Sequence, residues 1–142
     1  MASSRPLGLL GLLHLLIFAT TAAAEIILPS NYIGIEHFCG KELTATIAEF
    51  GYAAYREAQN SRAQRKFLPQ LINERWIVVG TDIGGDLFGR FCVIFKGDIF
   101  QAQSNNDLQA DVLITFVFSP LFAFTDISRR SIRVEKIEYH HV

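Results

Sequence analysis

Histidine is the side chain best suited to proton transfer near neutral pH, and this chain has few of them. Beyond the first two dozen residues they are His37, His140 and His141. His37 is far in sequence from the other two, which end the chain in a segment that we expect to be mobile. Adjacent histidines rarely present both rings to one ion, and no third ligand follows at a metal-binding spacing. The sequence therefore favours no metal, no cofactor and no histidine acid/base pair.

Sequence signatures of catalysis are also missing. The chain has no G-x-S-x-G nucleophile elbow, no Walker loop and no H-E-x-x-H zinc motif. Residues 83–86 (IGGD) lack the lysine and the following helix of a phosphate cradle, so they predict a turn. The basic residues Arg62, Arg65 and Lys66 indicate a solvated loop or, alternatively, an edge that contacts phosphate.

Two cysteines follow the N-terminal segment, Cys39 and Cys92. In an oxidising compartment they allow one intramolecular disulfide. Closing a loop of about fifty residues would stabilise the fold by roughly 4 kcal/mol. The alternative is two separate thiols, since Cys92 lies in an apolar run where a small hydrophobic residue fits. Of the two we favour the bridge between Cys39 and Cys92.

The N-terminal segment, residues 1–24, is typical of a secretory signal peptide. Leu7 to Phe18 form an apolar run after Arg5, and Ala22 to Ala24 supply the small residues of a cleavage site. The run is too short for an ordinary membrane span, although a retained anchor is the alternative. We expect residues 25–142 to form one soluble, secreted domain, monomeric and without a membrane contact after cleavage.

The amino-acid composition argues against two further classes of protein. The 142 residues include 13 Lys+Arg and 14 Asp+Glu, and half of them are apolar. So apolar a chain is not expected to be intrinsically disordered. The near-neutral charge argues against a general polyanion binder, although a local basic patch remains compatible with it.

Hydrophobic periodicity places the elements that would position any site. In residues 41–59, Leu43, Ile47, Phe50 and Ala54 fall on one helical face. Strand-like runs, with KGD at 96–98 as a hairpin turn, are predicted at 30–38, 76–79, 87–95, 99–103 and 111–118. The pattern predicts an α+β fold in which one helix packs on a mostly antiparallel, twisted sheet.

Two later segments have open interpretations. Residues 131–142 (SIRVEKIEYHHV) alternate with one residue of slippage, which fits a bulged edge strand or an extended arm. The apolar segment with Phe122 and Phe124 is expected to pack in the core; if exposed, it would be a contact surface for another protein.

Several short motifs resemble a known family. Phe38-Cys39-Gly40, followed by a helix ending in AEFGY (48–52), resembles the start of the small guanyl-specific ribonucleases secreted by fungi. Trp76-Ile77-Val78 is similar to their second strand, and residues 84–95 are similar to their Gly-rich turn and the strand after it, in which Arg90 takes the arginine position. The resemblance spans about residues 36–104 and implies a microbial ribonuclease-like fold.

The catalytic positions of that family are not kept. Where the family has a histidine on its first strand, this chain has Gln70, and residues 101–104 (QAQS) stand where its second histidine closes a strand. The place of its glutamate holds Arg75; Glu74 is one residue away and so faces the other side of a strand. RNA transesterification needs a base, an acid and a phosphate-stabilising cation, and only the cation has a holder, Arg90.

The signal peptide, the short mature body and the aromatic residue beside Cys39 also resemble the secreted effector candidates of powdery mildew fungi. This implies a non-catalytic, ribonuclease-like protein that reaches the host cell and binds a host protein or RNA to modulate plant immunity. The expected contacts are Arg90, Arg75, Trp76 and Glu74, because a cation and an indole can pair with phosphate and stack on a base. The alternatives are an active secreted endoribonuclease and an unrelated extracellular binding domain.

Overall fold

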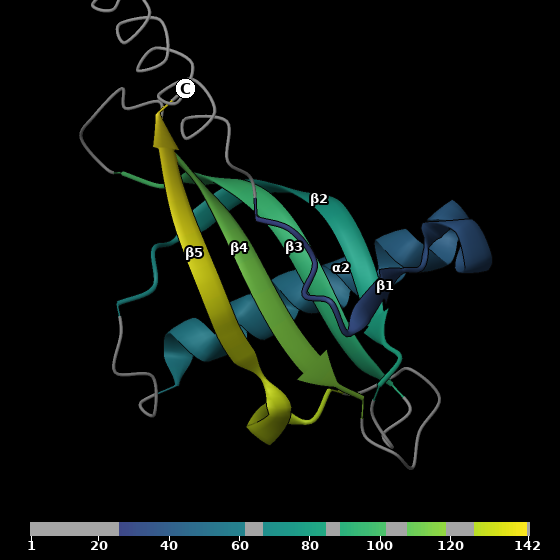
Figure 1. The fold of residues 1–142 in the computed structure, drawn as a ribbon. Helices are drawn as coiled ribbons and strands as arrows, with labels where there is room; N and C mark the ends of the chain where they lie inside the picture. The colour runs from purple at the N-terminus through teal and green to yellow at the C-terminus, as the bar shows by residue number, and fades with distance from the viewer. Residues whose placement is uncertain (1–25, 62–66, 85–88, 102–107, 119–126, 142) are drawn as a thin grey trace, which may run out of the picture.

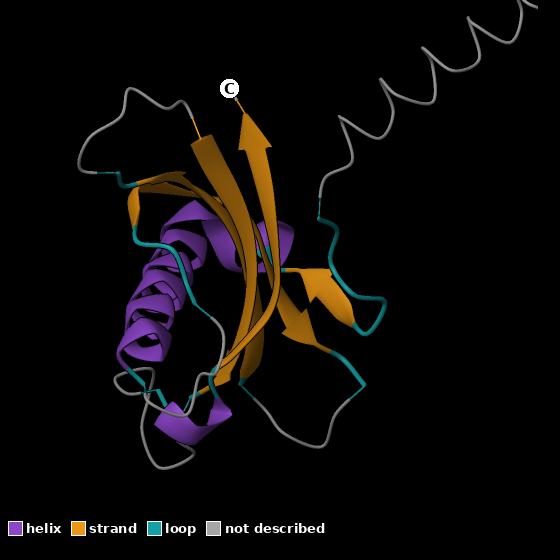
Figure 2. Cartoon of the chain, turned by 90° about the vertical axis from the view of Figure 1, so that its left-hand side faces the viewer, coloured by secondary structure: helices purple, strands orange, loops and turns teal. Residues whose placement is uncertain are grey.

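The computed structural model describes residues 26–61, 67–84, 89–101, 108–118 and 127–141. The described elements, in chain order, are β1 (Tyr32–Gly34), α2 (Glu36–Asn60), β2 (Leu71–Asp82), β3 (Arg90–Ile99), β4 (Leu108–Val117), the 3-10 helix η1 (Arg129–Ser131) and β5 (Arg133–His141). The strands form one antiparallel sheet in the order β1-β2-β3-β4-β5, and α2 lies across one of its faces (Figure 1, Figure 2). The predicted α+β fold, one helix on an antiparallel sheet, is confirmed.

Helix α2 contains the predicted helical segment and begins before it. Its first turn, from Glu36, is separated from the rest by a kink at Gly40, whose φ of 76° is left-handed and favours glycine. Residues 36–38, predicted as part of a strand, therefore belong to the helix. Ile47 and Ala54 of the predicted face are buried, whereas Leu43 is 38 % exposed.

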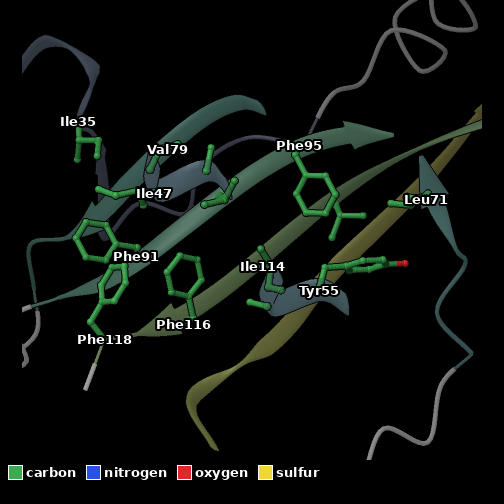
Figure 3. Packing of buried hydrophobic residues seen from close by; sticks show 14 of the residues in the cluster. Ile35, Ile47, Tyr55, Leu71, Val79, Phe91, Phe95, Ile114, Phe116 and Phe118 are labelled. Atoms are coloured by element: carbon green, nitrogen blue, oxygen red, sulfur yellow. The ribbon is translucent and has the colours of Figure 1, made fainter. Parts of the chain in front are cut away.

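The main core fills the space between α2 and the sheet (Figure 3). Phe95 in β3 is fully buried and packs edge-on against two helix residues, with ring centroids 5.1 Å from Tyr52 and 5.6 Å from Tyr55. Gly51 faces β3 at the closest approach of the helix, where a Cβ would lie 2.8 Å from Cγ2 of Val93. The glycine therefore lets α2 lie against the central strand.

The other side of the sheet, here called the open face, has a smaller apolar cluster. Residues 26–32 cross this side of the sheet (Figure 1). Ile26, Leu28 and Tyr32 pack there against Cys92 and Ile94 of β3 and against Leu113 of β4. One end of the open face is thus covered by the chain itself.

Two strand predictions need correction. The KGD sequence at 96–98 is not a turn: it lies inside β3, and each of its residues pairs with β4. Of the predicted strand at 99–103, Ile99 is the last residue of β3, the described residues 100 and 101 are outside the sheet, and 102 and 103 are not among the described residues. Gly97 has a packing reason, since a Cβ there would lie 3.0 Å from Cβ of Leu71 in β2.

The C-terminal segment is a strand, which decides between the two alternatives. β5 pairs with β4, and the register shifts by one residue between Leu113 and Ile114, which confirms the bulged edge strand. Among the described residues no helix has the length and apolarity to cross a membrane. Arg62, Arg65, Lys66, Phe122 and Phe124 lie outside the described residues.

Candidate functional site

The predicted contact residues of β2 point to different sides of the sheet. The carboxylate of Glu74 faces the helix, where its Oε1 accepts a hydrogen bond of 3.1 Å from Nη2 of Arg56. Trp76, two residues on, packs on the same side against the main core. Arg75 lies between them and pairs in register with Lys96. The predicted opposition of Glu74 and Arg75 is confirmed, but Arg75 and Trp76 do not share a face.

Arg90 and Arg75 are far apart on the open face. Arg90 begins β3, and the register partner of Arg75 is Lys96, six residues further along the same strand. At 3.4 Å per residue this separation is about 20 Å. Arg90 hydrogen-bonds to the hydroxyl of Tyr32, whose pKa is nevertheless raised, chiefly by burial. The expected surface of Arg90, Arg75 and Trp76 is therefore not assembled.

None of the described histidines lies beside Arg90. The next residues of β3 on the open face are Cys92 and Ile94, both fully buried and covered by residues 26–32. The described histidines lie elsewhere: His37 is in the first turn of α2, and His140 and His141 end β5. His140 pairs with Gln109 and His141 pairs with Leu108, at the end of β4 that is remote from Arg90.

The structure instead brings together Lys96, Asp111 and His140 on the open face. The Asp111 side chain is 1 % exposed, and its Oδ2 lies 2.9 Å from Nε2 of His140. Its Oδ1 lies 3.9 Å from Nζ of Lys96 and has no hydrogen-bond partner. When His140 is neutral, this contact places the ring proton on Nε2 and leaves Nδ1 as the basic nitrogen.

This cluster corrects the expectation of a mobile C-terminus. His140 is fixed in β5 by the ladder to β4 and by its contact with Asp111. A sequence signal existed, because Asp111 is a lone carboxylate in the apolar run that forms β4, where a buried charge needs a partner. The sequence does not identify that partner, since it lies 29 residues away.

More charged and polar groups surround the cluster. Asp98 accepts hydrogen bonds from Gln109 at 2.8 Å and from Asn73 at 3.1 Å, which hold the pKa of its carboxyl below the usual value. On β5, Nζ of Lys136 lies 3.0 Å from Oε1 of Glu138. We call this region the polar end of the open face; its charged residues, His140 apart, are Arg75, Lys96, Lys136, Asp98, Asp111, Glu135 and Glu138.

The polar end carries charges of both signs and no excess of cations. Its three cations, Arg75, Lys96 and Lys136, face four carboxylates, and the described contacts pair Lys96 with Asp111 and Lys136 with Glu138. Within the described part of the chain, no group of three or more His, Cys, Asp or Glu side chains is placed to hold a metal ion.

The cysteines do not form the predicted disulfide. Both are free thiols, with Cys39 exposed in the first turn of α2 and Cys92 buried on the open face of β3. The alternation of β3 places Cys92 in the smaller apolar cluster, beneath residues 26–32. Burial raises the pKa of the Cys92 thiol to about 12, so it remains protonated and unreactive near neutral pH.

This arrangement predicts different reactivities for the two thiols. A water-soluble maleimide should label Cys39 in the native protein and Cys92 only after unfolding, because Cys92 is fully buried. Mass spectrometry of labelled, unreduced protein checks this: one adduct is expected before unfolding and two after. A product with no adduct after unfolding, and with the mass of a disulfide, would restore the bridge.

Comparisons with known proteins give no relative: no family model, curated protein or solved structure matches the chain.

Proposed function

We propose that this protein is a secreted, non-catalytic effector with a ribonuclease-like scaffold, and that it binds a host protein through the polar end of the open face. The N-terminal segment, with its apolar run and small residues, supports secretion. The single helix on an antiparallel sheet is compatible with the resemblance to fungal ribonucleases.

The filling of the open face supports a loss of catalysis. RNA transesterification requires proton-transfer groups beside the phosphate-stabilising cation. The positions next to Arg90 along β3 hold Cys92 and Ile94, buried under Ile26 and Leu28. An imidazole and a carboxylate do meet at His140 and Asp111, but at the far end of the strands from Arg90.

The charge balance at the polar end favours a protein over RNA, and this observation carries the proposal. An RNA strand presents a uniformly negative backbone, so a binding surface for it needs an excess of cations and accessible aromatic rings. Here Lys96 and Lys136 are each paired with a carboxylate, and Trp76 packs on the helix side of the sheet. Alternating charges of both signs suit the mixed charges of a protein surface.

A capture experiment with two matched arginine variants tests this proposal. The secreted protein is immobilised and exposed to plant extract as wild type, as Arg75→Glu and as Arg130→Glu. Both arginines are exposed, but Arg75 lies at the polar end and Arg130 in η1, between β4 and β5. We expect a specific host protein to be retained by wild type and Arg130→Glu. Arg75→Glu should retain it at least about tenfold less, because like charges at an interface repel.

RNA binding is the outcome that would redirect the proposal. Labelled single-stranded RNA is titrated with the same three proteins at low and at physiological salt. We expect none of the three proteins to show salt-sensitive binding of this RNA. Salt-sensitive binding that Arg75→Glu abolishes would show that RNA is the ligand. Equal capture of the host protein by wild type and both variants would show that the polar end is not its binding site.

A further inference from the structure

Strand β5 leaves one side of its backbone unpaired within the described sheet. It is nine residues long and is the last strand in the order β1-β2-β3-β4-β5, so it pairs with β4 only. The opposite edge strand, β1, is three residues long. A long edge strand presents N–H and C=O groups to which another strand can pair.

A groove follows this edge, lined by apolar side chains together with Glu135 and Lys136. It has a volume of about 250 Å³ and lies between Phe67 and Leu68 on one side and residues 134–139 of β5 on the other. Phe67 is 88 % exposed and Tyr139 is 54 % exposed, which is unusual for rings of this size. If another strand paired with β5 here, its apolar side chains would cover the rings of Phe67 and Tyr139.

The bulge in β5 determines how its charges are presented. Lys136 pairs with Leu113 and Val134 pairs with Ile114, which leaves Glu135 as the extra residue. Oγ1 of Thr115, on the open face, lies 3.2 Å from Oε1 of Glu135, and the neighbouring Lys136 contacts Glu138 on that same face. Glu135 and Lys136 therefore point to the same side, which consecutive residues of a regular strand cannot do.

We propose that β5 pairs antiparallel with β5 of a second copy of this chain, with Glu135 opposite Lys136 and Arg133 opposite Glu138. On the helix side this register places Val134 opposite Ile137 and Ile132 opposite Tyr139. Directly opposed residues of an antiparallel pair must share a face, and the bulge makes this possible for Glu135 and Lys136.

Charge complementarity selects this register. Sliding the second strand by one residue would place Lys136 opposite Lys136 in one direction and Glu135 opposite Glu135 in the other. Charges and bulges at an edge ordinarily oppose pairing, but here their signs make one register attractive and its neighbours repulsive. The pairing is two-fold symmetric and uses the long edge of each sheet, so assembly stops at a dimer.

Sedimentation velocity over a concentration series tests the dimer. We expect wild type to shift from monomer to dimer as concentration rises. Arg133→Glu should weaken dimerisation by about tenfold or more, because the symmetric dimer would then contain two repulsive contacts between residue 133 and Glu138. The double variant R133E/E138R restores opposite charges and should dimerise again. The central exchange E135K/K136E should also dimerise, whereas E135K alone should not.

The control is Arg130→Glu, which makes the same charge change outside the strand and should dimerise as wild type does. Circular dichroism establishes that each variant is folded. A wild type that stays monomeric at every concentration, as the sequence led us to expect, overturns the proposal. So does a dimer unaffected by Arg133→Glu, or a pair of folded exchange variants that both remain monomeric. Since Arg75→Glu leaves β5 intact, it should still dimerise, which separates this test from that of host-protein binding.

Discussion

Phe95→Ala is expected to lower the free energy of unfolding by about 3–5 kcal/mol, the usual cost of removing a fully buried phenylalanine. The ring lies in the central part of the sheet and contacts both Tyr52 and Tyr55 of α2. Its removal would leave a cavity that α2 cannot close, because Gly51 and Val93 already bring helix and strand into contact. Urea denaturation of the purified protein measures the change.

Phe100→Ala is the matched control for Phe95→Ala. Phe100 follows β3 and is half exposed, so the same truncation removes less buried surface and should cost about 1 kcal/mol or less. Equal effects at the two positions would contradict the placement of Phe95 between the helix and the sheet.

Gly51→Ala should also destabilise the protein, although alanine is the better helix former by about 1 kcal/mol. The new Cβ would lie 2.8 Å from Cγ2 and 2.9 Å from Cβ of Val93. Val93 is fully buried and branched at Cβ, so it cannot rotate away, and overpacking of this kind costs about 1–3 kcal/mol. The expected net loss is up to about 2 kcal/mol of unfolding free energy, measured by the same denaturation.

Val93→Ala provides the test of mechanism for Gly51→Ala. Truncating Val93 makes room for the new methyl group, so the double variant should be more stable than the sum of the two single effects predicts. Additive effects, or a Gly51→Ala variant that is more stable than wild type, would show that helix and strand are not in contact at this point.

The sequence predicted the helix and the sheet because apolar residues repeat at the spacing of the buried face of each element. Ile47 and Ala54 repeat at helical spacing and are buried against the sheet, and the apolar run from Asp111 is strand β4. The failures occur where local signals compete with long-range packing. The KGD sequence has the composition of a turn, yet β4 pairs with it and Leu71 fills the space beside Gly97.

The site was less predictable than the fold. The alternation of a strand correctly separated Glu74 from Arg75, and the same rule applied to Trp76 would have excluded it from the face of Arg75. The contact between Asp111 and His140 depends on the register of β4 and β5, which no local pattern determines. The prediction of a disulfide was wrong, because the alternation of β3 buries Cys92 whereas Cys39 is exposed in the first turn of α2.

We expect the open face to bind its partner without cleaving RNA, and a cleavage assay measures this. The secreted protein is incubated with single-stranded RNA from acidic to mildly alkaline pH, and new 2′,3′-cyclic phosphate ends are counted against Arg90→Ala and His140→Ala. We predict no cleavage by wild type above the level of the two variants. Cleavage by wild type that either substitution abolishes would contradict the account and make the protein a ribonuclease.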